Sequence, residues 1–438
     1  MKYLCKIEKN DDFNIENAHS IVLEDNSMFT YTFWEQSYKN VTGKYSNIAI
    51  DLLYISLFVF YIDRIHSRDV SIDSWSRNIN MNIPVIELEK WNSNKELLQN
   101  MLNFLSGDTW KIEFRKREIT EKEKKYLNKI NDKESDDSVI CMFSGGLDSF
   151  IGAIDILEEN KNVIFISHYG GGKGTREFQQ YLKNILKEKY GINEENFFSF
   201  YAAAKEGVED TTRTRSFMFF SHAIAIASTL NKNVKLIIPE NGLISLNIPL
   251  TYSRLGSSST RTTHPYYMGM FKELLNKLGF TIEIKNPYQF KTKGEMILEC
   301  KNIELLKENI DKTMSCSHPD AGRMFKEVEA KHCGYCLPCI VRRASIKKGI
   351  GIDKTEYRDK DFKKHKVAKE NLNSYLLGIK RYNKNSAIMK IQLSGEIKEN
   401  INLYADLYNR GIDELKAILE DYYEWNIFPW YTFTYGFV

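Results

Sequence analysis

The sequence predicts an α/β protein whose central part is a doubly wound parallel sheet with helices on both faces. Two observations carry this prediction. Short apolar runs alternate with helical segments between residues 138 and 287, and a glycine-rich turn follows the first of these runs. Strands buried on both faces read as continuous apolar runs, so the pattern indicates a parallel sheet. We expect a ligand beyond the carboxyl ends of its strands.

The chain of 438 residues exceeds the usual size of one hydrophobic core, so we expect several domains. We predict an N-terminal α+β accessory domain over residues 1–136, the α/β domain over 137–350 and a C-terminal helical region over 351–438. In the first domain, "SIVLED", "FTYTFWE" and "WKIEFRKRE" read as strands, with helices near Leu52–Ile62 and Lys95–Leu105. The charged segment 119–137 is expected to be an exposed helix or a tether.

Strands and helices alternate through the α/β domain. The expected strands are "SVICMF", "NVIFIS", "FFSFYA", "VKLIIPE" and "FTIEIKNP", and the expected helices are "DSFIGAIDILEEN", "TREFQQYLKNILKEKYG" and "RSFMFFSHAIAIASTLN". Beyond residue 351, "FKKHKVAKENLNSYLLGIKRYN" and "LYADLYNRGIDELKAILEDYYEWNIF" have the periodicity of amphipathic helices. These two segments predict the helical C-terminal region.

Net charge and apolar runs bear on whether the protein binds nucleic acid, is secreted or spans a membrane. The formal net charge is only +3, so the composition does not favour nucleic acid as a partner. The N-terminal "MKYLCKIEKNDDF" lacks the residue order of a secretion signal, and the run Leu52–Ile62 is about half as long as a membrane span. We therefore expect a cytoplasmic protein without a membrane partner, in which this run is a buried helix.

The glycine-rich turn is a candidate phosphate-binding loop. A strand ending at Phe143 places Ser144, Gly145 and Gly146 in the turn, and Leu147, Asp148 and Ser149 at the start of a helix. Glycines let the backbone approach a ligand, the helix N-terminus offers free N–H groups, and the serines add hydroxyls. The loop lacks the lysine of a Walker motif. An ordinary β-to-α turn capped by Ser or Asp is the alternative.

A cysteine cluster follows the predicted sheet. Three cysteines form C-x₂-C-x₂-C at Cys333, Cys336 and Cys339, and Cys316 can complete a four-thiolate shell. Such a closed shell predicts a structural Zn²⁺ ion that holds the loop in place. An iron–sulfur cluster, scattered buried thiols and substitution of a ligand by His318 or His332 remain alternatives.

The loop "SGGLDS" is similar to the SGGxDS loop of the PP-loop, or N-type, ATP pyrophosphatases. That resemblance implies a sheet of the adenine nucleotide alpha hydrolase-like type and an enzyme that cleaves ATP between the α and β phosphates to form an adenylate. It implies ATP contacts from residues 143–149 and catalytic roles for Ser144, Asp148 and Ser149. Mg²⁺ would neutralise the pyrophosphate, with Asp148 helping to hold the ion.

The cysteine spacing C-x₁₆-C-x₂-C-x₂-C followed by "IVRR", together with "NPYQFKTKGEM", resembles the 7-cyano-7-deazaguanine synthase (QueC) family. The match covers about residues 138–348 and implies a catalytic Lys293, an ATP contact from Arg215 and adenylation of 7-carboxy-7-deazaguanine before C–N bond formation. Between the fourth and fifth expected strands, the segment "PENGLISLNIPLTYSRLGSSSTRTTHPYYMGM" departs from the QueC pattern and resembles that of the enlarged QueC-like proteins of bacterial anti-phage operons, of the QatC type. This likeness implies a protein partner from the same operon that receives the deazaguanine.

Other candidate residues follow predicted strands. Glu240 and Asn241 come after the fourth strand, where a carboxylate could accept hydrogen bonds from a guanine-like base, although a polar turn with a capping Asn is the alternative. Further substrate candidates lie in the next segment, which could equally be a solvated loop: Asn247, Arg254, Arg261 and His264. His168 follows the second strand, where the superfamily binds adenosine, but a lone histidine often only packs.

Two other functions fit the same motifs. One is modification of tRNA or another nucleic acid by a PP-loop enzyme, which predicts a basic surface. The other is a catalytically silent scaffold that binds nucleotide within a defence complex. The near balance of charge disfavours the first function.

Overall fold

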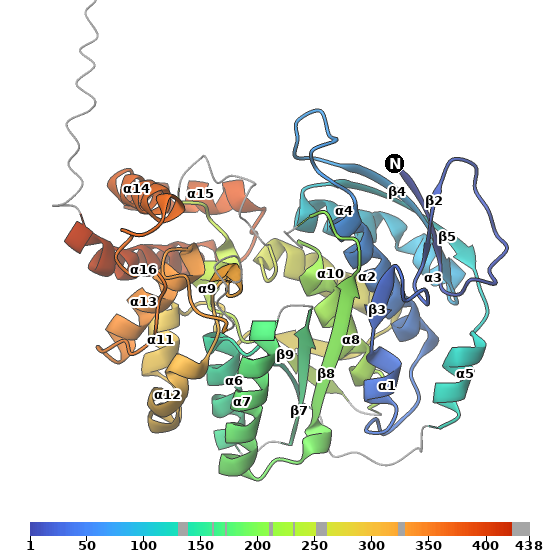
Figure 1. Ribbon diagram of the computed structural model, residues 1–438, viewed down its shortest axis with the longest axis horizontal. Coiled ribbons are helices and arrows are strands. Elements are labelled where there is room, and N and C mark those ends of the chain that lie inside the picture. The colour runs from blue at the N-terminus through green and yellow to red at the C-terminus, as the bar shows by residue number, and fades with distance from the viewer. Residues whose placement is uncertain are drawn as a thin grey trace, which may run out of the picture.

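The computed structural model describes residues 1–129, 139–159, 162–170, 173–209, 213–230, 233–250, 261–322 and 329–422. These residues form a mixed α/β structure with two sheets (Figure 1). The strands are β1 Lys2–Lys6, β2 His19–Val22, β3 Phe29–Tyr31, β4 Asn78–Val85, β5 Thr109–Lys116, β6 Val139–Met142, β7 Val163–Tyr169, β8 Phe197–Ala204, β9 Val234–Ile237 and β10 Ile282–Lys285.

The helices connect the strands and form the C-terminal region. They are α1 Phe33–Ser37, α2 Asn47–Ile65, α3 Leu88–Ser93, α4 Lys95–Ser106, α5 Glu121–Leu127, α6 Leu147–Glu158, α7 Lys173–Tyr190, α8 Arg215–Ala227, α9 Gly242–Leu246, α10 Pro265–Leu278, α11 Lys293–Leu298, α12 Ile303–Asn309, α13 Leu337–Gly349, α14 Lys366–Lys380, α15 Ala387–Ser394 and α16 Ile401–Leu419.

The larger sheet has the strand order β10-β9-β6-β7-β8-β3. Its first five strands in this order run parallel and are the five strands that the sequence predicts. The chain proceeds outward from β6 through β7 to β8, and then returns to the other side of β6 to form β9 and β10. The order therefore reverses between β6 and β9, and ligands in such sheets bind beyond the carboxyl ends at this point.

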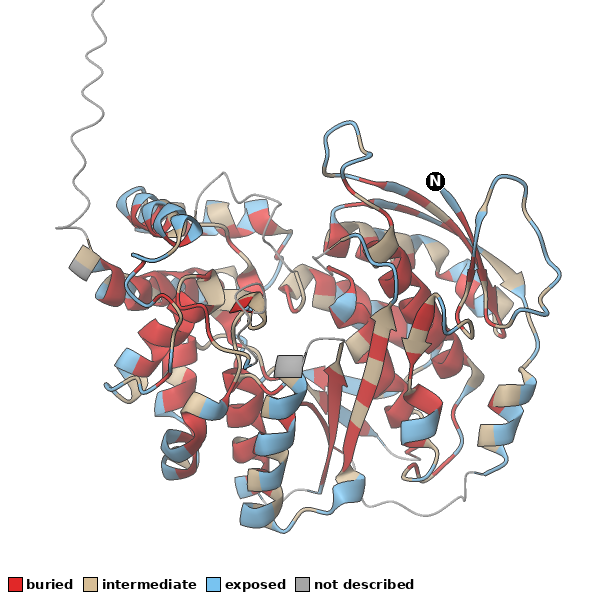
Figure 2. Cartoon of the chain, in the orientation of Figure 1, coloured by how far each residue is buried: buried red, intermediate tan, exposed pale blue. Residues whose placement is uncertain are grey.

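Helices cover both faces of this sheet, as the doubly wound prediction requires. Apolar side chains of α6 and α7 pack with those of β6 and β7 in one core. On the other face, α2, α8 and α10 pack against alternate residues of the same strands in a second core. Figure 2 shows α2 and β7 mostly buried. The parallel α/β architecture is therefore confirmed.

The N-terminal region is joined to the larger sheet instead of forming a separate core. Strand β3 pairs antiparallel with β8, with Phe29 opposite Ala204. One continuous hydrophobic core extends from Tyr3 to Ile284 and includes the buried faces of both sheets. The boundary predicted at residue 136 thus does not separate two independent cores, because α2 and β3 supply apolar surface that covers the α/β region.

The second sheet has the order β2-β1-β4-β5, with all strands parallel. The sequence analysis predicted strands near β2, β3 and β5 but gave none at β1 or β4. In the charged segment 119–137, the structure has the helix α5, and residues 130–137 lie outside the described residues. The capping box between Thr120 and Glu123 explains where α5 begins.

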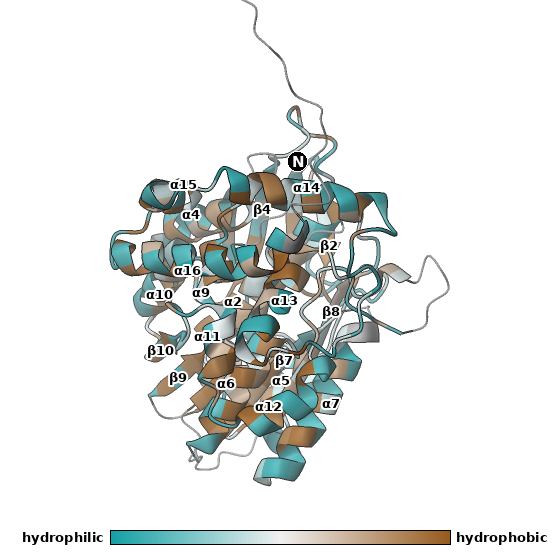
Figure 3. Ribbon diagram, turned by 90° about the vertical axis from the view of Figure 1, so that its left-hand side faces the viewer, coloured by the Kyte–Doolittle hydropathy of each residue, from teal (hydrophilic) through white to brown (hydrophobic). Residues whose placement is uncertain are grey.

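The C-terminal helices pack on the cysteine-bearing side of the molecule. Figure 3 views the molecule from the side on which α13, α14, α15 and α16 lie. Their core includes Tyr375 of α14, Ile391 of α15 and Leu407 of α16, and it continues to Ile340 of α13 and Leu246 of α9. Among the described residues up to 422, this region contains the helices α14, α15 and α16.

Helix α2 contains the most apolar run of the sequence. Its residues from Ile48 to Asp63 are buried, as predicted for this segment. Within the described ranges, no helix combines the length and the apolar character needed to cross a membrane.

Candidate functional site

The turn between β6 and α6 is held in one backbone conformation. Gly145 has a φ angle of +81°, which suits glycine. A Cβ atom there would lie 2.8 Å from Cγ of Gln179 on α7, so a side chain at position 145 would collide. Gln179 also donates from Nε2 to the carbonyl oxygen of Ser144 at 3.0 Å. The glycine therefore allows the loop to pack directly on α7.

Two serine hydroxyls belong to this loop, that of the exposed Ser144 and that of the buried Ser149. Ser144 is exposed and its Oγ lies 3.2 Å from Oγ of Ser149, which donates to the carbonyl oxygen of Gly146 at 3.0 Å. The loop leads into α6, whose first turn offers backbone N–H groups. Hydroxyls and helix N-terminal N–H groups are donors that bind phosphate. The geometry is thus suited to an anion.

Phe143 and Leu147 shape the loop without exposing their side chains. Phe143 is buried, donates its N–H to the carbonyl oxygen of Ile166 at 2.7 Å and accepts a hydrogen bond from Ser167 Oγ at 2.7 Å. Leu147 is also buried, and its N–H points to Ser315 Oγ at 3.4 Å. The sequence predicted ATP contacts from both residues. In the structure, both side chains are buried and their backbone groups contact other residues of the protein.

Asp148 is the centre of a buried polar cluster. Its Oδ1 lies 3.0 Å from Nζ of Lys293, the first residue of α11. Its Oδ2 accepts hydrogen bonds from the backbone N–H of Asn241 at 3.0 Å and from Nδ2 of Asn241 at 2.7 Å. Burial alone would raise the pKa of Asp148, but Lys293 and Asn241 outweigh it and lower the pKa. Asp148 is therefore held as a carboxylate beside an ammonium group.

This cluster brings together residues that are distant in the sequence. Asp148 follows β6, Asn241 follows β9, and Lys293 follows β10, so the three meet at the carboxyl edge where the strand order reverses. Because an ammonium group already neutralises Asp148, a Mg²⁺ ion at this carboxylate would have to compete with Lys293. The geometry favours Asp148 as a positioning group for Lys293.

Glu240 lies beside Asp148 and is half-buried. Burial and the negative charge of Asp148 raise the pKa of Glu240 well above its usual value. The carboxyl group of Glu240 therefore holds its proton to higher pH than an exposed glutamate. A role in accepting hydrogen bonds from a base requires that this proton be lost when the base binds.

Asn241 takes the capping role that the sequence analysis gave as an alternative. Its Oδ1 accepts a hydrogen bond from Ile244 N–H at 3.0 Å and so caps α9, while Nδ2 donates to Asp148. Asn247 ends the same helix with a φ angle of +49°. Asn241 and Asn247, which the sequence analysis gave as substrate-binding candidates, thus cap the two ends of the short helix α9. Asn241 also connects this helix to Asp148.

The four cysteines of the predicted metal site come together. Cys316, Cys333, Cys336 and Cys339 place their Sγ atoms within 4.8 Å of one another. Sγ of Cys316 lies 3.9 Å from that of Cys336, and Sγ of Cys333 lies 3.8 Å from that of Cys339. A tetrahedral Zn²⁺ with Zn–S bonds of about 2.3 Å separates its sulfurs by about 3.8 Å. The cluster fits a single ion such as Zn²⁺.

Backbone N–H groups point at these sulfurs. Cys316 Sγ accepts from the N–H of His318 and of Cys333 at 3.3 Å each, and Cys333 Sγ accepts from the N–H of Cys336 at 3.3 Å. Such hydrogen bonds stabilise thiolates. His332, an alternative ligand in the sequence analysis, instead accepts a hydrogen bond at Nε2 from the N–H of Ser315 at 3.3 Å.

The cysteine segment also contacts the anion loop. Met314 donates its N–H to the carbonyl oxygen of Gly145 at 2.9 Å, and Ser315 Oγ faces the N–H of Leu147. Both residues immediately precede Cys316. A metal ion held by the cysteines would therefore stiffen the segment that supports the anion loop, which gives the cluster a structural role near the site.

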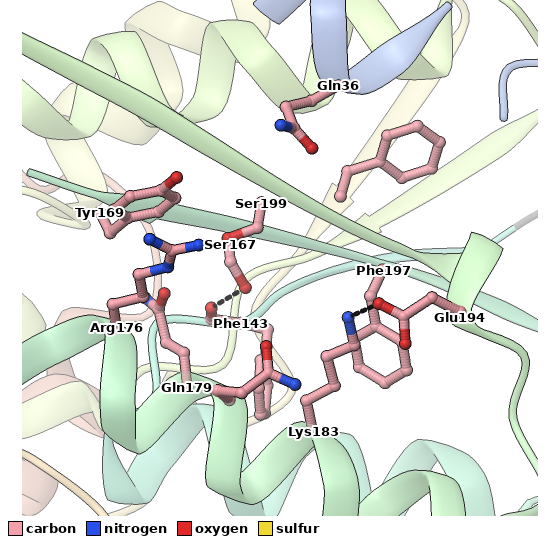
Figure 4. A pocket seen from close by; sticks show the side chains of 12 residues that line it. Gln36, Phe143, Ser167, Tyr169, Arg176, Gln179, Lys183, Glu194, Phe197 and Ser199 are labelled. Carbon is pink, nitrogen blue, oxygen red and sulfur yellow. Dashed lines mark hydrogen bonds and ion pairs between the residues drawn. The ribbon is translucent and has the colours of Figure 1, made fainter. Parts of the chain in front are cut away.

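A cavity of about 190 Å³ lies on the other side of Gln179 from the anion loop (Figure 4). Its polar lining includes Ser167, Ser199 and Arg176, with the Tyr169 ring 4.8 Å from the Arg176 guanidinium. Phe143 and Gln179 form the wall shared with the loop. The cavity is therefore next to the carboxyl end of β6.

His168 does not face this cavity. Its side chain lies on the opposite face of β7, with its ring 6.3 Å from Phe60, 6.1 Å from Phe219 and 6.4 Å from His222. Burial lowers the pKa of His168 well below its usual value, and His222 and Arg215 lower it further. This position in an aromatic core does not support its assignment to ATP.

The turn before α8 is held by the N-terminal region. Asp63 of α2 is buried and accepts hydrogen bonds from the N–H of Thr214 at 3.0 Å and from its hydroxyl at 2.9 Å. Arg213 donates to the carbonyl oxygen of Ser106 at 2.7 Å. Arg215, the first residue of α8, is exposed. The structure thus leaves Arg215 open to a ligand and uses Arg213 to join two regions.

Arg261 and His264 also join parts of the chain. Arg261 donates to the carbonyl oxygen of Phe104 at 2.7 Å and its guanidinium lies 4.3 Å from the Phe104 ring. His264 caps α10 and contacts Ser394 Oγ of α15 through Nε2 at 3.1 Å. These contacts do not support the substrate roles assigned to them. Arg254 lies outside the described residues.

Three residues near the site were not predicted from the sequence. Gln179 supports the anion loop, and Ser315 contacts it from the cysteine segment, yet neither belongs to a recognisable motif. Glu414 of α16 accepts hydrogen bonds from Thr292 and, at 2.9 Å, from Lys348, and so anchors the start of α11 next to Lys293. For Glu414, the sequence predicted only the helix that contains it, not its contact with Thr292 and Lys348.

The chain was compared with protein-family models and with characterised proteins. No family model matches it, and no curated protein is detectably similar.

Proposed function

We propose that this protein is a PP-loop ATP pyrophosphatase of the QueC-like family that adenylates a carboxylate and then forms a C–N bond. The observation that carries the proposal is the meeting of Asp148, Lys293 and Asn241 beside the serine-lined loop, at the point where the strand order reverses. This is where a doubly wound sheet binds its ligand. The sequence "SGGLDS" relates the loop to pyrophosphate binding.

In the proposed reaction, the β and γ phosphates of ATP lie against Ser144, Ser149 and the N-terminus of α6. The substrate carboxylate attacks the α phosphorus, the bond from that phosphorus to the bridging oxygen breaks, and pyrophosphate leaves with the electron pair. Lys293 adds positive charge where negative charge develops, and Asp148 holds its ammonium in place. When bound, Mg²⁺ would neutralise the pyrophosphate.

The acyl adenylate then reacts with an amine. The amine nitrogen attacks the acyl carbon, AMP leaves with its electron pair, and the nitrogen loses a proton. A carboxylate by itself resists this attack because it has a poor leaving group, which is the chemical reason for spending ATP. The acid we propose is 7-carboxy-7-deazaguanine, with Glu240 beside Asp148 as the group that recognises its base.

The rest of the site has supporting roles in this proposal. The cavity behind Gln179 takes the nucleoside of ATP, with Ser167 and Ser199 as polar contacts. The cysteine cluster holds Zn²⁺ and stiffens Met314 and Ser315 against the loop. The amine belongs to ammonia or to a protein partner from the same anti-phage operon, as in the Qat-type systems that the sequence resembles.

The proposal is tested by incubating the purified protein with ATP and 7-carboxy-7-deazaguanine. We expect AMP and pyrophosphate to form only when the acid is present. Ser144→Ala and Lys293→Met should each abolish their formation, while Lys291→Met, at a partly exposed neighbouring lysine, should not. Failure to form AMP with any deazaguanine acid would refute the substrate. If defence in cells survived Ser144→Ala with Asp148→Ala, the protein would be a scaffold.

Protein mass spectrometry identifies the acceptor. Candidate partner proteins are coexpressed with the active protein or with the Ser144→Ala variant, and their intact masses are compared. A mass increment that equals the deazaguanine acyl group, and that requires Ser144, would support conjugation. Unchanged partner masses together with a free amide or nitrile product would restrict the reaction to small molecules.

A further inference from the structure

The smaller sheet has one face that no helix covers. Figure 1 shows α2, α3 and α4 on one side of β1, β2, β4 and β5, and within the described residues no helix lies on the other side. We call the uncovered side the outer face. A sheet whose strands are all parallel normally has both faces covered. The outer face is therefore an unusual surface for a protein of this class.

Polar side chains form rows across the outer face. Strand register places Lys2 of β1, Asn80 of β4 and Lys111 of β5 side by side. In the next row, Leu4 of β1, Asn82 and Glu113 lie side by side; Leu4 and Asn82 are buried, and Glu113 is exposed. The alternation "NINMNIPV" in β4 puts apolar residues on the covered face and asparagine amides on the outer face. At the partly exposed Asn80, strand β4 thus presents a hydrogen-bonding group where a sheet covered on both faces would present an apolar one.

Positive charge dominates these rows. The strand positions of the outer face carry four basic residues and one acidic residue: Lys2, Lys6, Lys111 and Arg115 against Glu113. Lys2 and Lys111 are exposed, and neither has an ion-pair partner among the described residues. The row Lys2–Asn80–Lys111 therefore combines unpaired cations with an amide between them.

The chain itself shows which side chains this face accepts. The segment between β1 and β2 begins "IEKNDDF" and contacts Lys6 and Arg115 at one end of the outer face. In that segment Asp11 pairs with Arg115 and its carbonyl oxygen accepts from Lys6 Nζ at 2.6 Å, while the ring of Phe13 lies 4.8 Å from the Arg115 guanidinium. An acidic and aromatic segment of the protein thus covers one end of the outer face and leaves Lys2 and Lys111 uncovered.

We propose that the uncovered part of the outer face, the row Lys2–Asn80–Lys111, docks an acidic segment of a partner protein. Lysine ammonium groups bind its carboxylates, and asparagine amides bind its backbone. Single-stranded nucleic acid fits less well, since no strand position of the outer face carries an aromatic ring on which bases could stack. This docking does not depend on the proposed enzymatic activity.

The test uses a fluorescein-labelled synthetic peptide made of tandem Asn-Asp-Asp-Phe repeats and the full-length protein. Fluorescence anisotropy should show saturable binding that weakens as salt is added. Lys2→Glu with Lys111→Glu should weaken binding about tenfold or more, and Glu113→Lys should strengthen it, because each change alters the charge facing the peptide. All three positions are exposed, and equal melting temperatures would verify that the variants are folded.

A matched pair of lysines controls for total charge. Lys366→Glu with Lys398→Glu changes the net charge equally at side chains that are 91% and 77% exposed on the C-terminal helices and their connections. This pair should bind the peptide like the unmodified protein. Equal weakening by both pairs, or no saturable binding, would overturn the proposal. Tighter binding of a single-stranded oligonucleotide that also requires Lys2 and Lys111 would reassign the face to nucleic acid.

Discussion

Replacing Lys293 by methionine removes the positive charge from a buried ion pair. Asp148 and Lys293 expose only 8% and 6% of their side chains, and their charged atoms are 3.0 Å apart. Methionine has a similar length but cannot neutralise Asp148. Removing one partner of a buried pair costs about 3–5 kcal/mol because the remaining charge is left without compensation. We expect Lys293→Met to lower the free energy of unfolding by that amount at neutral pH.

The loss of stability should depend on pH. In the unmodified protein, Lys293 and Asn241 lower the pKa of Asp148, so its contribution is present above the unfolded pKa of about 3.9 and is lost as the pH falls through the folded pKa. Without Lys293, burial becomes the dominant influence and raises the pKa of Asp148. The variant then loses stability as the pH rises above about 3.9. The difference between the two proteins should therefore grow from acidic to neutral pH.

Urea unfolding followed by far-ultraviolet circular dichroism measures both effects. The free energies of the unmodified protein and of Lys293→Met are compared at pH values from mildly acidic to mildly alkaline. Asp148→Asn combined with Lys293→Met should recover part of the stability and lose this pH dependence, because no buried charge remains. Lys291→Met, at a partly exposed lysine whose ion pair with Glu299 is on the surface, should cost less than about 1 kcal/mol. A loss of stability that is the same at every pH would refute the ion-pair explanation.

Three further predictions concern the loop, the metal and the contact between regions. Gly145→Ala should cost about 2–4 kcal/mol by thermal unfolding, because Gly145 has a positive φ angle and a Cβ atom there would contact Gln179. The control Gly191→Ala, with φ of +68° and no atom within 4 Å of its Cβ position, should cost only about 1–2 kcal/mol. Equal losses of stability would contradict the contribution of the Gln179 contact. Elemental analysis should find one zinc ion per chain, and its chelation should lower the melting temperature and weaken ATP binding; iron with acid-labile sulfide would refute the single-ion site. Arg261→Ala should lower the free energy of unfolding by about 1–2 kcal/mol because its contacts with Phe104 are lost, and the KM for the acid substrate should not change. A higher KM without any loss of stability would instead show that Arg261 binds the substrate.

Features that depend on neighbouring residues could be predicted from the sequence. Apolar runs mark the five parallel strands from β6 to β10, and "SGGLDS" lies in the turn after the first of them. The spacing C-x₂-C-x₂-C places three thiols in one tight turn, and Cys316 completes the group. In each case the backbone geometry of a short segment decides where the side chains point, and short-range periodicity reports that geometry.

The tertiary structure decided which distant residues meet. Lys293 reaches Asp148 because β10 and β6 have their carboxyl ends at the same edge of one sheet, and Gln179 reaches the anion loop because α7 packs under it. His168 and Ser167 are neighbours in β7 but face opposite sides of the sheet, so one lies in an aromatic core and the other lines the cavity.

The sequence alone determined the local elements, the loop and the cysteine spacing, whereas the packing of α2, α4 and α15 decided that Asp63, Arg261 and His264 join separate parts of the chain. These residues look like polar loop or helix positions until their partners are known. The physical reason is that strand order and helix packing are set by buried surfaces contributed from many segments at once, which a short sequence pattern does not record.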